Sequence, residues 1–161
     1  MTEPRQYALA SLFGPATIDM IGHTPHAKRL RMRVIETGPA MAVITLPYHE
    51  ELVGDPSRGV IFGGAITTLL DHASGLCVAC ALPELTAIAT IDLRVDYLRA
   101  AQPEHDLFAR TECYKVTRNV AFVRGTAWEH DAADPFATSH GTFMLGANPS
   151  EIWLGRLVKN D

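Results

Sequence analysis

Residues Gly63 to Cys80 read GGAITTLLDHASGLCVAC, and their pattern sets the architecture expected for the whole chain. The large apolar side chains of this stretch recur with the period of an α-helix, so at about 100° per residue they share one face. That face holds Ile66, Leu69, Leu70, Ala73, Cys77 and Cys80. The pattern predicts a helix over residues 63–82 that packs this face on a sheet and ends before Pro83.

The opposite face of this helix is made of small residues. They are Gly64, Thr67, Thr68, Asp71, Ser74 and Gly75. A helix face exposed to water normally carries long polar side chains, so this composition indicates that another helix or a ligand approaches the backbone closely. Asp71 is then a carboxylate that is at least half-buried. The pattern leaves open whether it accepts structural hydrogen bonds or has a functional role.

The start of the helix is unusual because two glycines, Gly63 and Gly64, occupy it. No side chain covers the N–H groups of the first turn, and the helix dipole is positive at this end. Such an end can bind an oxyanion, although a tight loop before the helix would also favour glycine.

The segments on either side of the helix alternate as strands do. The expected strands are residues 29–37, 40–46, 87–98, 107–116, 120–129 and 136–145, with a loop over 48–59. One long central helix wrapped by a curved antiparallel sheet is an α+β fold. We expect one domain over residues 29–146, preceded by an N-terminal capping segment, 1–28, and followed by a C-terminal tail, 147–161.

Composition and charge exclude some classes of function. The net charge of −4 argues against broad nucleic-acid binding, which requires a cationic surface. No uninterrupted apolar run reaches the roughly 18–20 residues of a membrane span, and the N-terminus does not resemble a signal peptide. We therefore expect a cytoplasmic protein that does not enter a membrane.

The cysteines and paired histidines are expected to be structural. The chain has three cysteines, and the pair Cys77 and Cys80 lies within the helical stretch, which predicts buried free thiols. His23 and His26 flank Pro25, which disfavours a regular helix there, and no acidic ligand is near in the sequence. Surface loop histidines are therefore favoured over a metal site, and we expect neither a metal nor a cofactor.

Residues 59–71, GVIFGGAITTLLD, resemble the G-x-x-H-G-G-x-x-x-x-L-x-D signature of the PaaI-type hotdog thioesterases, a family named for phenylacetyl-CoA hydrolysis. Residues 90–99 resemble the third strand of that family, and the likeness covers about residues 29–146. The resemblance implies a hotdog fold and a hydrolase that cleaves acyl-CoA thioesters. By motif position it assigns the base or nucleophile to Asp71, the oxyanion-binding N–H to Gly63 and a water-positioning hydroxyl to Thr90.

The sequence departs from this family at two positions. Phe62 replaces the histidine before the glycine pair, and Pro56 stands where an asparagine is common. Phe62 and Gly64 flank Gly63 and are expected to contact the substrate. Phe62 either alters substrate choice or marks a subgroup that binds acyl-CoA without efficient hydrolysis, and such a non-catalytic acyl-CoA-binding protein is the main alternative.

Two further enzyme classes fit the sequence less well. Hotdog dehydratases need an aspartate and a histidine in one pocket, but His72 projects about 100° away from Asp71 around the helix. A Ser-His-Asp hydrolase would need a G-x-S-x-G motif, which the chain lacks.

Coenzyme A carries phosphates, so basic residues are expected at the mouth of the site. The candidates are Arg58, Lys115 and Arg118, each of which is otherwise an ordinary surface charge.

The spacing of Gly63 and Asp71 predicts a homo-oligomer, a dimer or a dimer of dimers. Eight residues of helix separate them by about 12 Å along the axis, whereas reacting groups must lie within about 3–3.5 Å. One helix therefore cannot supply both groups to one carbonyl, but a second, antiparallel copy can.

Overall fold

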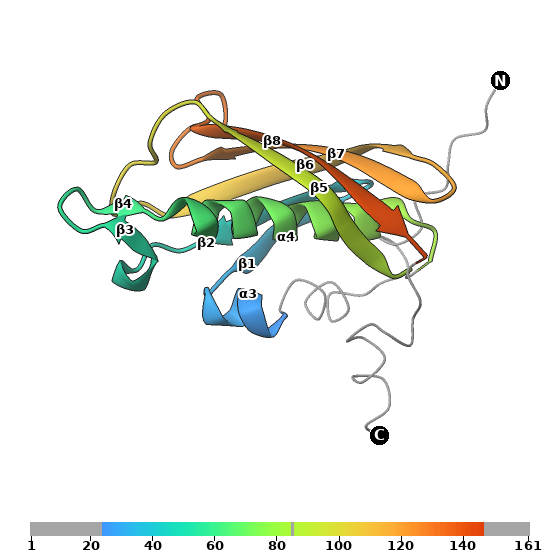
Figure 1. Cartoon of the computed structure of the whole chain (residues 1–161), viewed down its shortest axis with the longest axis horizontal. Helices are drawn as coiled ribbons and strands as arrows, with labels where there is room; N and C mark the ends of the chain where they lie inside the picture. The colour runs from blue at the N-terminus through green and yellow to red at the C-terminus, as the bar shows by residue number, and fades with distance from the viewer. Residues whose placement is uncertain (1–23, 85, 147–161) are drawn as a thin grey trace.

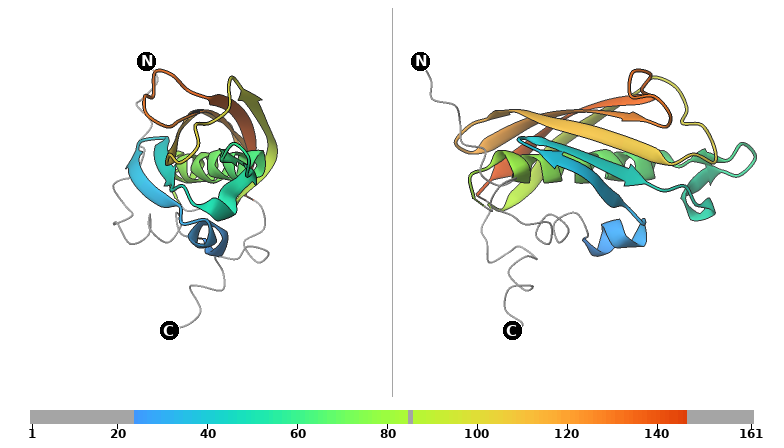
Figure 2. Two further views of the ribbon diagram at one scale, coloured as in Figure 1. Left: turned by 90° about the vertical axis from the view of Figure 1, so that its left-hand side faces the viewer. Right: turned by 180° about the vertical axis from the view of Figure 1, so that it is seen from behind.

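A six-stranded antiparallel sheet lies over one side of the long helix α4 (Gly63–Ala81) (Figure 1). The structure, a computed structural model, describes residues 24–84 and 86–146. The sheet order is β1-β2-β6-β7-β8-β5. Its strands are β1 (Arg33–Gly38), β2 (Met41–Leu46), β5 (Ile88–Tyr97), β6 (Leu107–Val116), β7 (Val120–Trp128) and β8 (Ala137–Leu145). Seen along the helix, the sheet curls around α4 from β1 to β5 (Figure 2), so the predicted α+β fold is confirmed.

Several local features differ from the sequence expectation. The first strand begins at Arg33 rather than at residue 29, which belongs to a short helix. The segment expected to be a loop contains a 3-10 turn, η1 (Glu50–Leu52), and a small hairpin of β3 (Val53–Asp55) and β4 (Val60–Ile61). Residues around Pro25 form a short helix, α3 (Pro25–Arg29), so the expectation of irregular geometry there was wrong. Proline is tolerated because it takes the first helical position, where its missing N–H has no partner to lose. His23 and most of the expected capping segment and tail lie outside the described residues.

The predicted core face of α4 is buried against the sheet. Ile66, Leu69, Leu70, Ala73, Cys77 and Cys80 are each at most 4% exposed. Ser74, which the sequence placed on the small-residue face, is also fully buried. The reason is the curvature of the sheet, which covers more of the helix circumference than a flat sheet would.

By length and composition alone, α4 is apolar enough to cross a membrane. More than half of that apolar window is buried within the fold, however. This is the burial pattern of a core helix.

The three cysteines are buried and free, as predicted. Burial raises the pKa of the Cys80 thiol to about 11, and burial also raises that of Cys77. Both thiols are therefore protonated at neutral pH and poorly reactive.

Strand β5 carries a bulge that decides which side chains face α4. Its pairing with β8 shifts between Thr90 and Asp92, so Ile91 is the extra residue. Alternate residues of a regular strand point to opposite faces, and one inserted residue reverses that alternation. Thr90 and Tyr97 are seven residues apart and would face opposite sides of a regular strand. Because of the bulge, both side chains contact α4.

The loop after β5 is held by an ion pair between the buried carboxylate of Glu129 and the half-buried guanidinium of Arg99. Arg99 donates to both carboxylate oxygens of Glu129, at 2.7 and 2.8 Å, and the backbone N–H of Gln102 donates to the same carboxylate at 2.7 Å. In the same loop, Pro103 lies against Gly59, whose φ of +67° favours glycine. The ion pair thus braces the segment that leads into α4.

We expect Glu129→Gln to lower the free energy of unfolding by about 2 kcal/mol at pH 7, between the values for exposed and buried pairs, because the Glu129 side chain is buried but that of Arg99 is 33% exposed. Burial tends to raise the pKa of Glu129, but the Arg99 and Gln102 hydrogen bonds prevail and lower it. The stabilisation is therefore present above the ordinary glutamate pKa and is lost as the pH falls through the folded-state value.

Urea denaturation between pH 7 and pH 3 measures this difference. The control is Glu112→Gln, which removes an exposed pair with Arg124 and should cost at most about 1 kcal/mol. Equal losses for the two variants, or a Glu129→Gln effect that grows toward low pH, would contradict the prediction.

Candidate active site

Asp71 lies in the middle of α4, on the side where β5 runs next to the helix. Its side chain is half-buried, and Thr90 of β5 donates a hydrogen bond from its hydroxyl to the Asp71 Oδ1 at 2.9 Å. The structure therefore brings together two of the three residues predicted for catalysis. The contact fixes one carboxylate oxygen and leaves the second available to another group.

The first turn of α4 has no side-chain cap. Phe62 occupies the N-cap position and makes no capping hydrogen bond, and Gly63 and Gly64 follow it as the first helical residues. The Phe62 side chain is 64% exposed. Its ring lies against Gly64, where an added Cβ would come within 2.5 Å of it. A side chain at position 64 would therefore require the exposed Phe62 ring to move.

A further residue, Tyr97, completes the start of the helix. Its hydroxyl donates to the Gly63 carbonyl at 3.0 Å and would lie 3.2 Å from a Cβ at that position. The Thr67 hydroxyl donates to the same carbonyl at 3.1 Å. Sequence reasoning missed Tyr97 because strict alternation from Thr90 places it on the other face of β5. Only the bulge at Ile91 turns it toward α4.

Gly63 and Asp71 are not brought together within the chain. Both belong to the continuous helix α4, at its first residue and in its middle. A helical rise of 1.5 Å per residue separates them by about 12 Å. Within one chain, the predicted oxyanion donor, Gly63, and the predicted carboxylate, Asp71, are therefore too far apart to act on the same carbonyl.

The predicted basic residues also lie at different ends of the molecule. Arg58 precedes β4 near the start of α4, and its Nε donates to Asp55 at 2.8 Å. Hydrogen bonds to Ser57 are the main reason that the Asp55 pKa is lowered. Lys115 and Arg118 lie at or next to the β6–β7 turn. The carbonyl of Asn119 in this turn accepts a hydrogen bond from the N–H of Leu145. Leu145 in turn pairs with Ile88, the first residue of β5. That is the end of β5 remote from Tyr97 and Gly63.

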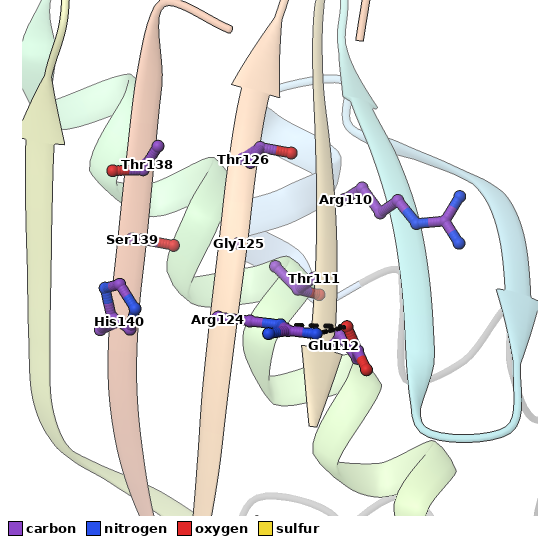
Figure 3. Close-up of a pocket in the computed structure, with 9 residues that line it drawn as sticks. All are labelled: Arg110, Thr111, Glu112, Arg124, Gly125, Thr126, Thr138, Ser139 and His140. Atoms are coloured by element: carbon purple, nitrogen blue, oxygen red, sulfur yellow. Dashed lines mark hydrogen bonds and ion pairs between the residues drawn. The ribbon is translucent and has the colours of Figure 1, made fainter. Parts of the chain in front are cut away.

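A hollow of about 250 Å³ opens on the sheet (Figure 3). Its lining comes from β6, β7 and β8: Arg110, Thr111, Glu112, Arg124, Gly125, Thr126, Thr138, Ser139 and His140. None of the residues predicted for catalysis or substrate binding lines it. The candidate site is therefore not this hollow but the open side of α4 along β5.

Strand β5 is the last strand of the sheet, and its outer edge pairs with no other described strand. It is ten residues long and includes exposed apolar side chains at Ile91 and Tyr97. Its open N–H and C=O groups can pair with another chain, although the bulge at Ile91 and the charged residues Asp92, Arg94 and Asp96 restrict which strand can do so.

Comparisons with known proteins agree with this architecture. The sequence profile of the thioesterase superfamily matches residues 58–134. A putative esterase of Halobacterium salinarum, VNG_1336C, is 39% identical over 116 residues, which are 70% of this chain and 68% of that protein. The medium/long-chain acyl-CoA thioesterase YigI of Escherichia coli is 28% identical over 137 residues, covering 77% of this chain and 87% of YigI.

The solved structures show the same fold. The E. coli PaaI protein superposes with a TM-score of 0.69 at 17% identity and covers 78% of this chain and 87% of PaaI, a likeness of fold alone. The profile match includes the glycine pair that begins α4, the carboxylate in its middle and strand β5. Together with the relative that is 39% identical, it shows that the chain belongs to the thioesterase superfamily, with the hotdog fold.

Proposed function

We propose that this protein hydrolyses an acyl-CoA thioester to a free acid and coenzyme A. The observation that carries the proposal is the half-buried Asp71 carboxylate, held by Thr90 on the open side of α4. The acyl-CoA substrate is supported by the likeness to YigI, whose name states that activity.

In the proposed reaction, Asp71 either removes a proton from a water molecule, whose oxygen then bonds to the thioester carbonyl carbon, or bonds to that carbon directly through its own carboxylate oxygen. The carbonyl oxygen gains negative charge, and the Gly63 N–H at the positive end of α4 donates to it. The carbon–sulfur bond then breaks, and the thiolate leaves and takes a proton. In the direct route, water hydrolyses the resulting anhydride. Thr90 holds the carboxylate and positions the water.

We place the two groups of each site on different chains of a two-fold homo-oligomer. An antiparallel second copy of α4 brings its Gly63 next to Asp71, and the small residues between them permit close packing. The exposed edge of β5 supports the same arrangement, since Thr90 near one end contacts Asp71 and Tyr97 at the other end contacts Gly63. If two β5 edges paired antiparallel, the Thr90 end of one strand, with its Asp71, would lie next to the Tyr97 end of the other, with its Gly63.

The same arrangement supports a role for the basic residues. The β6–β7 turn of one chain, with Lys115 and Arg118, would approach the start of the partner's α4, where Arg58 lies. These side chains are candidates for binding the phosphates of coenzyme A. Free buried thiols fit a reducing compartment, and we assign the protein to the cytoplasm.

A non-catalytic acyl-CoA-binding protein is the second candidate, and Phe62 is the observation that favours it. The residue places an apolar ring beside the first turn of α4 where PaaI-type enzymes carry a histidine. A binding protein would retain acyl-CoA without releasing the thiol.

A thiol-release assay against aromatic, short-chain and long-chain acyl-CoAs separates the two candidates. We expect turnover of at least one substrate class. Saturable binding of acyl-CoA without thiol release from any of them would reject hydrolysis in favour of a binding function.

The Phe62 ring is expected to favour aromatic or branched acyl groups over small polar ones. Phe62→His should lower the ratio of kcat/KM for an aromatic acyl-CoA to that for a small hydroxylated one by about 10-fold, because a polar ring replaces apolar contact. Phe108→His is the control, because Phe108 lies on β6 and stacks on Trp128, with Leu107 and Ala109 on either side buried in the core. An unchanged ratio in Phe62→His would make Phe62 a packing residue with no part in selection.

A further inference from the structure

The carbonyl of Gly63 accepts more hydrogen bonds than a helix carbonyl normally does. The α-helical pattern pairs it with the N–H of Thr67. The hydroxyls of Thr67 and Tyr97 donate to it as well, at 3.1 and 3.0 Å, and lie 3.4 Å from each other. The threonine bond is a common local feature of helices. The tyrosine bond comes from a different element, β5, and has no such local cause.

These bonds act on a peptide group that begins the helix. The Gly63 carbonyl and the Gly64 N–H belong to the same planar unit, so fixing the oxygen also fixes the direction of that N–H. Hydrogen bonds in a chain polarise one another, and donation to the oxygen makes the N–H a stronger donor. Gly64 is the second helical residue, and its N–H has no acceptor within the helix.

Two features show that the Tyr97 contact depends on the local structure of the chain. The bulge at Ile91 turns Tyr97 toward α4. The absence of a side chain at Gly63 leaves room for the hydroxyl, which would lie only 3.2 Å from a Cβ there.

We infer that Tyr97 is a positioning residue for thioester hydrolysis. Its hydroxyl orients and polarises the Gly63–Gly64 peptide, so that the Gly64 N–H serves as a second donor to the developing oxyanion next to the Gly63 N–H. The inference rests on the proposed function. It adds a second role for β5, which holds Asp71 through Thr90 and the oxyanion-binding turn through Tyr97.

The test is Tyr97→Phe, which removes the hydroxyl and keeps the ring. We expect kcat to fall about 3- to 10-fold, the scale of one neutral hydrogen bond, with KM changed less than about 2-fold. The matched control is Tyr114→Phe, because Tyr114 is 52% exposed, against 50% for Tyr97, and contacts Phe122 and Arg124 away from α4. It should leave kcat unchanged.

A second readout does not require turnover. In an amide NMR spectrum of the full chain, the Gly64 N–H proton should move upfield in Tyr97→Phe and stay in place in Tyr114→Phe. An active wild type with an unchanged kcat or an unmoved Gly64 resonance in Tyr97→Phe overturns this inference alone. A wild type that releases thiol from no acyl-CoA overturns the proposed function, whatever the resonance does.

Discussion

Replacing Asp71 with asparagine is expected to lower the rate of acyl-CoA hydrolysis by at least about 100-fold, the scale of losing a general base. The amide of asparagine can neither remove a proton from water nor attack a carbonyl. It has nearly the same shape, and its carbonyl oxygen can still accept the 2.9 Å hydrogen bond that Thr90 donates to Asp71. The variant should therefore fold and bind substrate, with the loss confined to kcat.

Steady-state kinetics with a thermal melt of the same sample measures both effects. Asp92→Asn provides the control, because it removes an exposed carboxylate from the same strand as Thr90. Near-wild-type turnover by a properly folded Asp71→Asn protein would mean that Asp71 is a structural residue, with its carboxylate serving only the bond to Thr90.

Valine at position 63 is expected to reduce hydrolysis by about 100- to 1,000-fold, the effect of losing one oxyanion donor. Even a single added Cβ would lie 3.2 Å from the Tyr97 hydroxyl, and the two methyl groups of valine need more room than the start of α4 offers. They would also cover the N–H that the oxyanion is proposed to use. Gly63→Ala, with one methyl group, should fall between wild type and Gly63→Val.

The measurement is kcat for each variant, with circular dichroism and size-exclusion chromatography to confirm fold and assembly. Activity within a few-fold of wild type in an intact Gly63→Val protein would remove the start of α4 from the mechanism.

Much of the fold could be predicted because it follows from local periodicity. The apolar face of α4 and the succession of the main strands along the chain could be predicted from the sequence, since burial repeats with the period of each element. The family resemblance assigned Thr90 and Asp71 to one site, but the hydrogen bond between them is a finding of the structure. The periodicity of the helix showed only that Asp71 lay on a face of small residues.

The features that were missed depend on contacts between distant parts of the chain. The bulge at Ile91 turns Tyr97 toward Gly63, yet one extra residue in a strand leaves no mark on its composition. The pairing of Arg99 with Glu129 joins two loops 30 residues apart. Ser74 is buried because the sheet curves, a property of the whole sheet rather than of the helix.

The shared active site is tested most directly by mixing the two inactive chains. Asp71→Asn and Gly63→Val proteins are co-expressed with different tags, and formation of hybrid dimers is confirmed by tandem purification. In a two-fold hybrid dimer, one active site contains both substitutions and the other contains neither. Random mixing makes about half of the dimers hybrid. We expect about a quarter of wild-type activity to return in the mixture and about half in purified hybrids. Confirmed hybrid dimers with no more activity than either parent would show that each site lies within one chain.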